Sequence, residues 1–322
     1  MASVDAIRTT LGARFPDASA PTASTPSANE FVIFSKPELG RLTGADLESV
    51  WDLFAQSLTT YGVTVHQVKI LTGPELDAAG AMQQHYGVIN QISRLGRPAL
   101  TEAAERALQD QFADTLEQAT VLGGHQFLDR FAEFSPFSLA MLFSNASVGR
   151  LGPGTYAAPV KIDGETVIVL NGFHPRQLAF FTAGDAVCAF LHGSSETDWD
   201  VLRSKLIGST DPAKADAGSI RGRLFADPSG FGLASVNSNF NGVHMSAGPL
   251  EGLAELGRFF GDAQDWGFAG ALAEAGASPE DIAGLVENPA IEVDGERTTA
   301  FDTTEGLNAA PAAQILVQAQ RV

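Results

Sequence analysis

The sequence has little sulfur and few basic residues. Its 322 residues include one cysteine, Cys188, so an intrachain disulfide is impossible. Lysine and arginine number 20 against 38 aspartates and glutamates, which gives a formal net charge of −18. Such an acidic surface repels phosphodiester backbones and anionic lipids, and this argues against general nucleic-acid binding and against a membrane partner. An anionic substrate would need a local basic pocket, a metal ion or both.

Long hydrophobic runs and several catalytic motifs are also missing. The first fifteen residues hold no long apolar stretch, so no signal peptide is predicted. The longest apolar runs fall short of the roughly 20 residues that span a bilayer, and a cytoplasmic location is expected. The glycine-rich segment 149–156 lacks the Gly-Lys-Ser/Thr ending of a Walker A loop, and no Gly-x-Ser-x-Gly elbow occurs. No pair of histidines or cysteines has the spacing of metal ligands.

The hydrophobic content of the chain is sufficient for a folded core. Hydrophobic residues make up 44% of the chain, and its length suggests about two domains. Residues 16–29 are rich in proline, alanine, serine and threonine without periodicity, which predicts a linker. We therefore expect residues 1–28 to form a weakly ordered N-terminal segment ahead of the main fold.

Hydrophobic periodicity predicts three blocks after this linker. The first block is strand–helix–strand–helix, and the second is a polar helix followed by a hairpin with its turn at Asp163-Gly164. The third block begins near Ala183 with a strand and a helix, and it ends in a tail with a helix capped by Ser278. The predicted elements are strand 30–35, helix 44–62, strand 63–71, helix 73–86, helix 98–123, strands 158–162 and 166–170, strand 186–191, helix 194–207 and helix 249–260.

Two segments carry candidate chemistry. Residues 203–223 hold five of the 20 basic residues, and arginines around a small-residue loop suit phosphate oxygens. The alternative is a solvated basic loop that balances nearby acids. In the second segment, Glu255 lies eleven residues after His244, on a predicted helix, where its carboxylate could hold one ring nitrogen and leave the other as a nucleophile. Alone, such a histidine beside a glycine is more often structural than catalytic.

Together, these segments resemble the nucleoside diphosphate kinase family. Six pieces match in the order of the family: the K-P-[DE] strand end, the H-Y dipeptide, the G-x-T-[ND]-P loop, the G-[TS]-[IL]-R segment, the N-x-x-H-G-S-D histidine motif, and a glutamate followed by an aromatic pair. In this chain they are Lys36–Glu38, His85-Tyr86, Gly208–Pro212, Gly218–Arg221, Asn241–Ala247 and Glu255–Phe260. The resemblance covers residues 29–92 and 180–262, roughly half of the chain.

The resemblance implies an α+β fold of ferredoxin-like type, with an antiparallel four-stranded sheet and helices. An insertion of about 80 residues, 93–179, would interrupt this nucleoside diphosphate kinase-like domain, and residues 263–322 would form a C-terminal extension. Family members usually assemble, so the resemblance also implies a homo-oligomer.

The resemblance further implies a phosphotransferase that moves the γ-phosphoryl group of ATP or another nucleoside triphosphate, through a phosphohistidine, to a nucleoside diphosphate or a related acceptor. His244 would carry the phosphoryl group, Glu255 would orient its ring, and Ser246 would support the site. Asn241 would contact the sugar hydroxyl, and Mg²⁺ would bridge the phosphates without protein ligands. The residues implied to hold phosphates are Lys36, Tyr86, Arg203, Thr210 and Arg221.

Departures from the family pattern support a second hypothesis, a catalytically impaired nucleotide-binding or scaffolding protein on the same fold. Met245 and Ala247 replace the glycine and aspartate of the histidine motif, and the methionine is expected to add bulk beside the nucleophile. The family's phosphate-binding arginine falls at Ser204, so the arginine beside it or Lys205 would have to serve. No aromatic residue follows the H-Y pair. New base contacts from Phe173, His174 and Arg176, or plain packing of a hairpin exit by these three residues, are both open.

Overall fold

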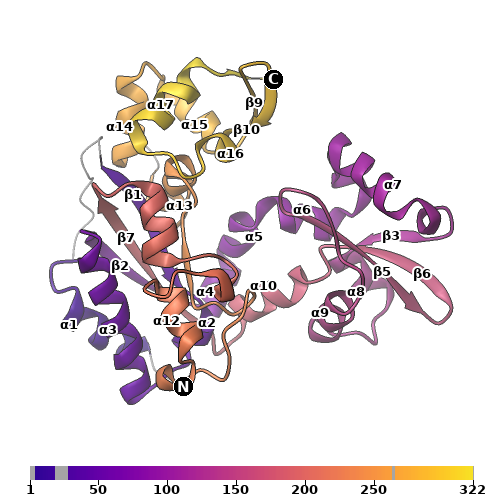
Figure 1. Cartoon of the computed structure of the whole chain (residues 1–322), viewed down its shortest axis with the longest axis horizontal. Helices are drawn as coiled ribbons and strands as arrows, with labels where there is room; N and C mark the ends of the chain where they lie inside the picture. The colour runs from indigo at the N-terminus through magenta and orange to yellow at the C-terminus, as the bar shows by residue number, and fades with distance from the viewer. Residues whose placement is uncertain (1–3, 19–27, 263–264, 322) are drawn as a thin grey trace. The chain divides into compact units, whose positions relative to one another are not determined.

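The computed structural model describes residues 4–18, 28–262 and 265–321 (Figure 1). Most of the predicted linker, residues 19–27, lies outside the described residues. The chain forms two compact units: unit 1 comprises Met1–Gly73 with Gly184–Val322, and unit 2 comprises Pro74–Ala183. Among the described residues, no helix has both the length and the apolar character required to cross a membrane.

Unit 1 is built on a four-stranded sheet. Its strands are β1 (Asn29–Ser35), β2 (Thr64–Thr72), β7 (Val187–Ser195) and β8 (Val243–Met245), in the order β2-β7-β1-β8, and all neighbours are antiparallel. Helical segments connect the first strand to the second and the third to the fourth, which is the ferredoxin-like arrangement. The predicted fold class is confirmed, and β1 is buried along its whole length, as its apolar run indicates.

The connection between β2 and β7 is where unit 2 is inserted. Thr72 of β2 pairs with Val187 of β7, and just beyond this pair the Gly73 N–H donates to the Ala186 carbonyl at 2.8 Å. The two points at which the chain leaves and re-enters unit 1 are therefore hydrogen-bonded neighbours.

Helical segments lie on both faces of this sheet: Phe259 contacts Phe34 and Phe190 on one face, and the helix that follows β1 covers the other through apolar side chains. In α3 (Gly44–Thr60) the buried Leu47, Trp51, Phe54 and Leu58 follow the predicted helical spacing and join the core with Ile33 of β1. The other helical segments of this part are α2 (Pro37–Gly40), α4 (Gly73–Ala78, which crosses into unit 2), α11 (Trp199–Val201), the π-helical turn Leu202–Ile207, the 3₁₀ turns Pro212–Lys214 and Ser229–Phe231, α12 (Ile220–Ala226) and α13 (Pro249–Phe259).

The N-terminal segment differs from its prediction. Residues Val4–Arg14 form α1, whose Ile7 and Leu11 are buried in the core of unit 1. The Arg14 guanidinium lies 2.6 Å from Glu48 and 2.8 Å from Asp52, both on α3. The expectation of a weakly ordered segment is therefore wrong for α1, because two apolar residues one helical turn apart are enough to dock a short helix.

The C-terminal extension belongs to unit 1. It contains α14 (Gly267–Glu274), α15 (Pro279–Leu285), α16 (Ala300–Thr304), α17 (Ala309–Gln318) and a small sheet in the order β10-β9-β11, with strands Ala290–Val293 (β9), Glu296–Thr299 (β10) and Gln320–Arg321 (β11). The helix predicted after Ser278 is confirmed, and the Ser278 hydroxyl caps it by accepting from Asp281 N. The small sheet was not predicted, because its strands are too short to show alternation.

Unit 2 has its own sheet and cores. The strands β3 (Thr120–Gly123), β4 (Gly149–Gly152), β5 (Thr155–Ile162) and β6 (Glu165–Leu170) lie in the order β3-β6-β5-β4. The predicted hairpin is confirmed, with positive φ at Asp163 and Gly164 as such a turn requires. The helices are α5 (Ala81–His85), α6 (Gly87–Leu95), the 3₁₀ turn Arg97–Ala99, α7 (Glu102–Leu116), α8 (Gly124–Arg130), α9 (Pro136–Ser144) and α10 (His174–Thr182).

The boundary of unit 2 lies earlier than the sequence indicates. The sequence places the insertion at 93–179, whereas the compact unit begins at Pro74 and ends at Ala183. The reason is packing: α6 contacts α8 and β3, and α10 contacts α5 and α6. The residues between 74 and 92 therefore fold together with the insertion.

Candidate active site

A histidine and a glutamate meet at the edge of the sheet of unit 1. His244 lies on β8 opposite Phe34 of β1, and the two rings stack with centroids 4.4 Å apart. The Nε2 atom of His244 is 2.8 Å from Oε1 of Glu255, whose side chain is buried on α13. When Nε2 carries the proton and donates to this carboxylate, the lone pair is on Nδ1. The histidine side chain is 17% exposed, so the carboxylate is sheltered while the ring still reaches solvent.

Ser246 fixes the other oxygen of the same carboxylate. Its hydroxyl donates to Oε2 of Glu255 at 2.5 Å and accepts from the backbone N–H of Val32 at 3.0 Å. Both oxygens of Glu255 are therefore engaged, and the orientation of the carboxylate is set before any ligand binds. The structure thus brings together three predicted residues, His244, Glu255 and Ser246.

Met245 lies on the opposite face of β8. Successive side chains of a strand point to opposite faces, and Met245 is buried in the main core of unit 1 beside its partner Ile33. The expectation that this methionine adds bulk beside the nucleophile is therefore wrong.

Two basic side chains gather at the start of β8. Arg221 of α12 donates to the carbonyls of Gly208 and Val243, both at 2.8 Å, and it is 9% exposed. Burial lowers the pKa of Lys36 to about 8, with Glu38 opposing this shift and the positive charge of Arg221 adding to it. Two buried cations whose charges act on each other are stabilised by an anion, and this is the electrostatic setting that phosphate groups favour.

Asn241 and the loop that contains Thr210 are joined beside these cations. The Asn241 amide donates to the Thr210 carbonyl at 3.0 Å, and the asparagine is fully buried. Its carbonyl oxygen, Oδ1, has no hydrogen-bond partner among the described residues. A buried acceptor of this kind suits a hydroxyl donor, which is compatible with the contact to a sugar hydroxyl implied by the resemblance. The Thr210 side chain itself is exposed.

The turn before β8 accepts only glycine. Gly242 has φ +80°, and a Cβ atom there would lie 2.6 Å from Leu224. Its backbone joins the turn to the end of β1: Gly242 N donates to Glu38 Oε1 and Lys36 N donates to the Gly242 carbonyl, both at 2.8 Å. These bonds fix Asn241 and Lys36 on either side of the turn.

A π-helical turn accounts for the displaced arginine. Gly208 N donates to the carbonyl of Arg203, five residues earlier, at 2.9 Å. A π-turn is an α-helical turn with one added residue, so Arg203 takes the position that a residue four before the glycine has in an α-helix. Arg203 forms an ion pair with Glu305 at 2.7 Å, whereas Lys205 pairs with Asp216. Arg203 and Lys205 were the two candidates to replace the family's arginine. Of these, Arg203 is the one whose positive charge reaches α13, where it lowers the pKa of Glu251.

Glu251 is a residue that sequence reasoning missed. It precedes Glu255 by one helical turn on α13, and burial together with the charge of Glu255 raises its pKa to about 8, while the Ala247 N–H and Arg203 oppose the shift. The raised pKa favours the protonated, neutral form of Glu251. The available signal was its spacing, since carboxylates four residues apart share one face of a helix.

The remaining predicted residues belong to unit 2. Tyr86 packs against His85 and Phe181, with ring centroids 4.6 Å and 6.0 Å away, and its role toward phosphate stays a prediction.

His174 is fully buried, with its ring nitrogens 3.1 Å from Gln177 and 3.3 Å from Asn90. The other two insertion candidates also pack within unit 2: the ring of Phe173 contacts Phe143 and Tyr156, and the guanidinium of Arg176 lies over Phe137. These contacts favour the packing alternative for all three residues.

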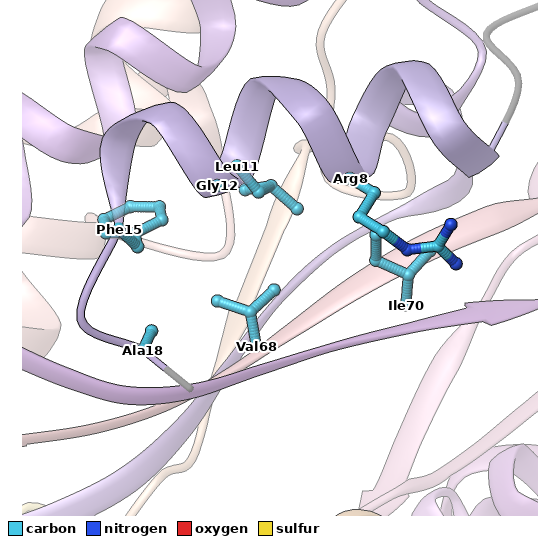
Figure 2. Close-up of a pocket in the computed structure, with 7 residues that line it drawn as sticks. All are labelled: Arg8, Leu11, Gly12, Phe15, Ala18, Val68 and Ile70. Atoms are coloured by element: carbon cyan, nitrogen blue, oxygen red, sulfur yellow. The ribbon is translucent and has the colours of Figure 1, made fainter. Parts of the chain in front are cut away.

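Figure 2 shows a cavity elsewhere in unit 1, between α1 and β2. Its volume is about 250 Å³, and Arg8, which pairs with Asp5, lies at its border. None of the predicted site residues lines it, so it is separate from the His244 site. The lining residues are Arg8, Leu11, Gly12, Phe15, Ala18, Val68 and Ile70.

Comparison with known proteins gives a consistent result. The chain is 33% identical over 90 residues to nucleoside diphosphate kinase II, chloroplastic, of Arabidopsis thaliana, and this covers 28% of the chain and 33% of the relative. It is 32% identical over 88 residues to a nucleoside diphosphate kinase of Thermomicrobium roseum, covering 27% of the chain and 50% of that relative. The matches thus span a third to a half of the relatives' own length. No protein-family profile matches the chain.

A solved structure is also similar. It is an NDP kinase from Pyrobaculum aerophilum, with 16% identity and a TM-score of 0.36, and the match covers 74% of this chain and 99% of that one. Because this TM-score is low, the fold assignment rests on the strand order of unit 1 and not on this match. The sequence matches confirm the resemblance: the chain is a divergent protein similar to nucleoside diphosphate kinases.

Proposed function

We propose that this chain is a phosphotransferase that moves the γ-phosphoryl group of a nucleoside triphosphate through a phosphohistidine at His244 to a nucleoside diphosphate or a related acceptor. The observation that carries the proposal is the arrangement of His244, Glu255 and Ser246. One ring nitrogen faces a fully engaged carboxylate at 2.8 Å, and this leaves the lone pair on the other.

The chemistry follows from this tautomer. The Nδ1 lone pair of His244 forms a bond to the γ-phosphorus while the bond from that phosphorus to the bridging oxygen breaks, and the diphosphate leaves with the electron pair. No proton has to leave Nδ1. The ring gains positive character, which Glu255 stabilises through Nε2–H. In the second half-reaction a terminal phosphate oxygen of the acceptor attacks the phosphohistidine, and the ring returns to its first state.

The basic side chains would hold the phosphates. Lys36, Arg221 and Arg203 neutralise oxygens whose charge grows or shifts during transfer, which is the main requirement of phosphoryl transfer. Mg²⁺ would arrive on the nucleotide phosphates as part of the substrate, since these side chains are cations that suit oxygens rather than ligands for the ion. Asn241 would bind the sugar hydroxyl through its buried carbonyl oxygen.

The test is intact-protein mass spectrometry after incubation with Mg·ATP at neutral pH. We expect an acid-labile phosphoryl adduct on the wild-type chain and on His66→Ala, a matched control whose histidine lies in the same sheet and bonds Ser194. His244→Ala should fold and carry no adduct. An adduct of the same yield on His244→Ala would overturn the proposal. Nucleoside diphosphates are the first acceptors to add.

The second candidate is a nucleotide-binding or scaffolding protein without transfer activity. Ala247, in place of the motif aspartate, is the observation that still favours it. The other two departures from the family pattern favour this candidate less. Met245 is buried in the core, and the π-turn accounts for the one-residue offset of Arg203. Calorimetric binding of Mg·ADP together with no adduct on the wild-type chain would support this candidate.

A further inference from the structure

The ion pair between Arg203 and Glu305 joins the C-terminal extension to the candidate phosphate site. One guanidinium nitrogen of Arg203, Nη1, lies 2.7 Å from one oxygen of Glu305. A guanidinium has five N–H donors in a fixed plane, so a contact of this kind occupies only a part of them. Both side chains are partly exposed, 37% for the arginine and 48% for the glutamate, so a ligand can reach the pair.

The backbone on both sides of Glu305 is anchored to unit 1. Thr304 is fully buried, and Gly306 N donates to the carbonyl of Ala247 at 2.9 Å. Gly248 lies so close that a Cβ atom there would be 2.4 Å from the Thr304 carbonyl. The segment that presents Glu305 therefore rests directly on the turn between His244 and α13.

Asn308 provides a second anchor three residues later. Its Oδ1 accepts from the side chain of Asn29 at 2.9 Å and from the backbone of Trp199 at 2.8 Å, and its amide donates to Asp198. Asn29 begins β1, and Trp199 begins the helical segment that carries Arg203. The acid and the arginine that it contacts are thus held by the same framework.

We propose that Glu305 is a positioning residue that fixes the guanidinium of Arg203, so that the C-terminal extension supplies a part of the phosphate site. The inference rests on the proposed function. An arginine side chain is long and flexible, and pinning one nitrogen on an anchored carboxylate leaves the remaining donors in one orientation for phosphate oxygens. Displacing Glu305 would require movement of a backbone that is buried at Thr304 and hydrogen-bonded at Gly306, which argues against the opposite role of a competitor for phosphate.

Two substitutions distinguish positioning from competition. Glu305→Ala removes the oxygen that orients Arg203, whereas Glu305→Gln keeps an oxygen that accepts the same hydrogen bond and removes the charge. We expect Glu305→Ala to raise the KM for Mg·ATP in phosphohistidine formation by about threefold to fivefold, with little change in kcat. Glu305→Gln should restore the KM to within about twofold of the wild type. A lower KM in both variants, or no change in either, would overturn the inference.

A control and a second background complete the experiment. Asp302→Asn removes one negative charge from α16, the helix that ends just before Glu305, and its carboxylate bonds Thr299 rather than Arg203, so its KM should equal that of the wild type. In an Arg203→Ala background, Glu305→Ala should have no further effect on KM. A further increase there would mean that Glu305 acts without Arg203 and would overturn the inference.

The inference can fail independently of the proposed function. If the wild-type chain forms no phosphohistidine, the same variants are compared by the calorimetric Kd of Mg·ADP. A weaker Kd in Glu305→Ala, restored in Glu305→Gln, would then support the positioning role and refute the catalytic one. If the wild type binds no Mg·ADP, both proposals are refuted.

Discussion

The charge of Lys36 illustrates how single residues set the behaviour of the site. Burial lowers its pKa to about 8, so the ammonium group loses its proton only a little above neutral pH. The carboxyl group of Glu251 has a pKa raised to about 8 by burial and by Glu255, so it gains a negative charge over the same interval. As the pH rises through 8, the site thus loses one positive charge and gains one negative charge.

The binding of phosphates should weaken over this interval. We expect the Kd of Mg·ADP to be nearly constant below about pH 8 and to rise by about tenfold per pH unit or less above it, because the protonated lysine is the form that binds an anion. Lys36→Arg should reduce this rise in Kd, because a guanidinium stays charged. The rise that remains would come from the ionisation of Glu251. Calorimetry between about pH 7 and about pH 9 measures both curves. A wild-type Kd that falls with pH would contradict the prediction.

The sequence predicts the residues of the site where they belong to a recognisable motif. His244, Ser246 and Asn241 lie within one short segment, and Glu255 follows on the next helix, so their proximity could be predicted. Glu305 could not, because its contact with Arg203 depends on the path of the whole C-terminal extension through unit 1.

At the scale of elements, the π-turn shows how a helix can absorb an added residue. The turn places Arg203 five residues before Gly208 with a direct hydrogen bond between them. Ser204, within the turn, is exposed, whereas Leu202, Leu206 and Ile207 are buried. The added residue is therefore accommodated on the exposed side of the turn, and the three apolar side chains stay buried in the core.

Deletion of Ser204 should therefore be tolerated. The deletion converts the π-turn to an α-turn with Arg203 four residues before Gly208, and we expect the KM for Mg·ATP to stay within about twofold and the stability within about 1 kcal/mol of the wild type. Inserting an alanine after Ser204 is the matched control, and it rotates the arginine by about 100° away from the site. Enzyme kinetics and urea unfolding test both variants. Loss of nucleotide binding in the deletion variant would contradict the role given to the π-turn.

Elements with long apolar patterns were predicted well. Strand β1 and helix α3 have continuous or helical apolar spacing, and both form as expected. Helix α1 was missed because it buries only two apolar residues, Ile7 and Leu11, and strand β9 was missed because four residues are too few to show alternation. In both cases tertiary contacts decide the structure, and local sequence carries little of that information.

At the scale of the whole molecule, the C-terminal extension is part of the core of unit 1. Asn308 connects β1, the start of the helical segment at Trp199 and Asp198 through side-chain hydrogen bonds. Gly267 at the start of α14 adds a further link, because its N–H donates to buried Glu30 at 2.7 Å. The extension therefore cannot detach without breaking hydrogen bonds to Asn29 and Glu30 of β1.

Asn308→Ala should destabilise unit 1. The substitution removes the acceptor of the Trp199 N–H and of one of the two Asn29 amide hydrogens in a part-buried place, and we expect a loss of about 2 kcal/mol in the free energy of unfolding. Asn145→Ala is the control, since that asparagine is exposed and bonds only within the end of its own helix in the described structure. Urea unfolding followed by tryptophan fluorescence measures the difference. Equal midpoints for the two variants would contradict this account of the extension.

The hydrogen bond from Gly73 to Ala186 has a consequence for how the chain folds. Strands β2 and β7 are sheet partners, yet all of unit 2 lies between them in the chain. The entropy of closing a loop grows with its length, so pairing these strands across an unfolded insertion is slower than pairing them across a folded one. Unit 2 is a continuous segment and leaves the ribosome before β7 does. The inserted unit therefore acts as a large preformed turn, and the sheet that carries the candidate site is completed only after this unit has folded.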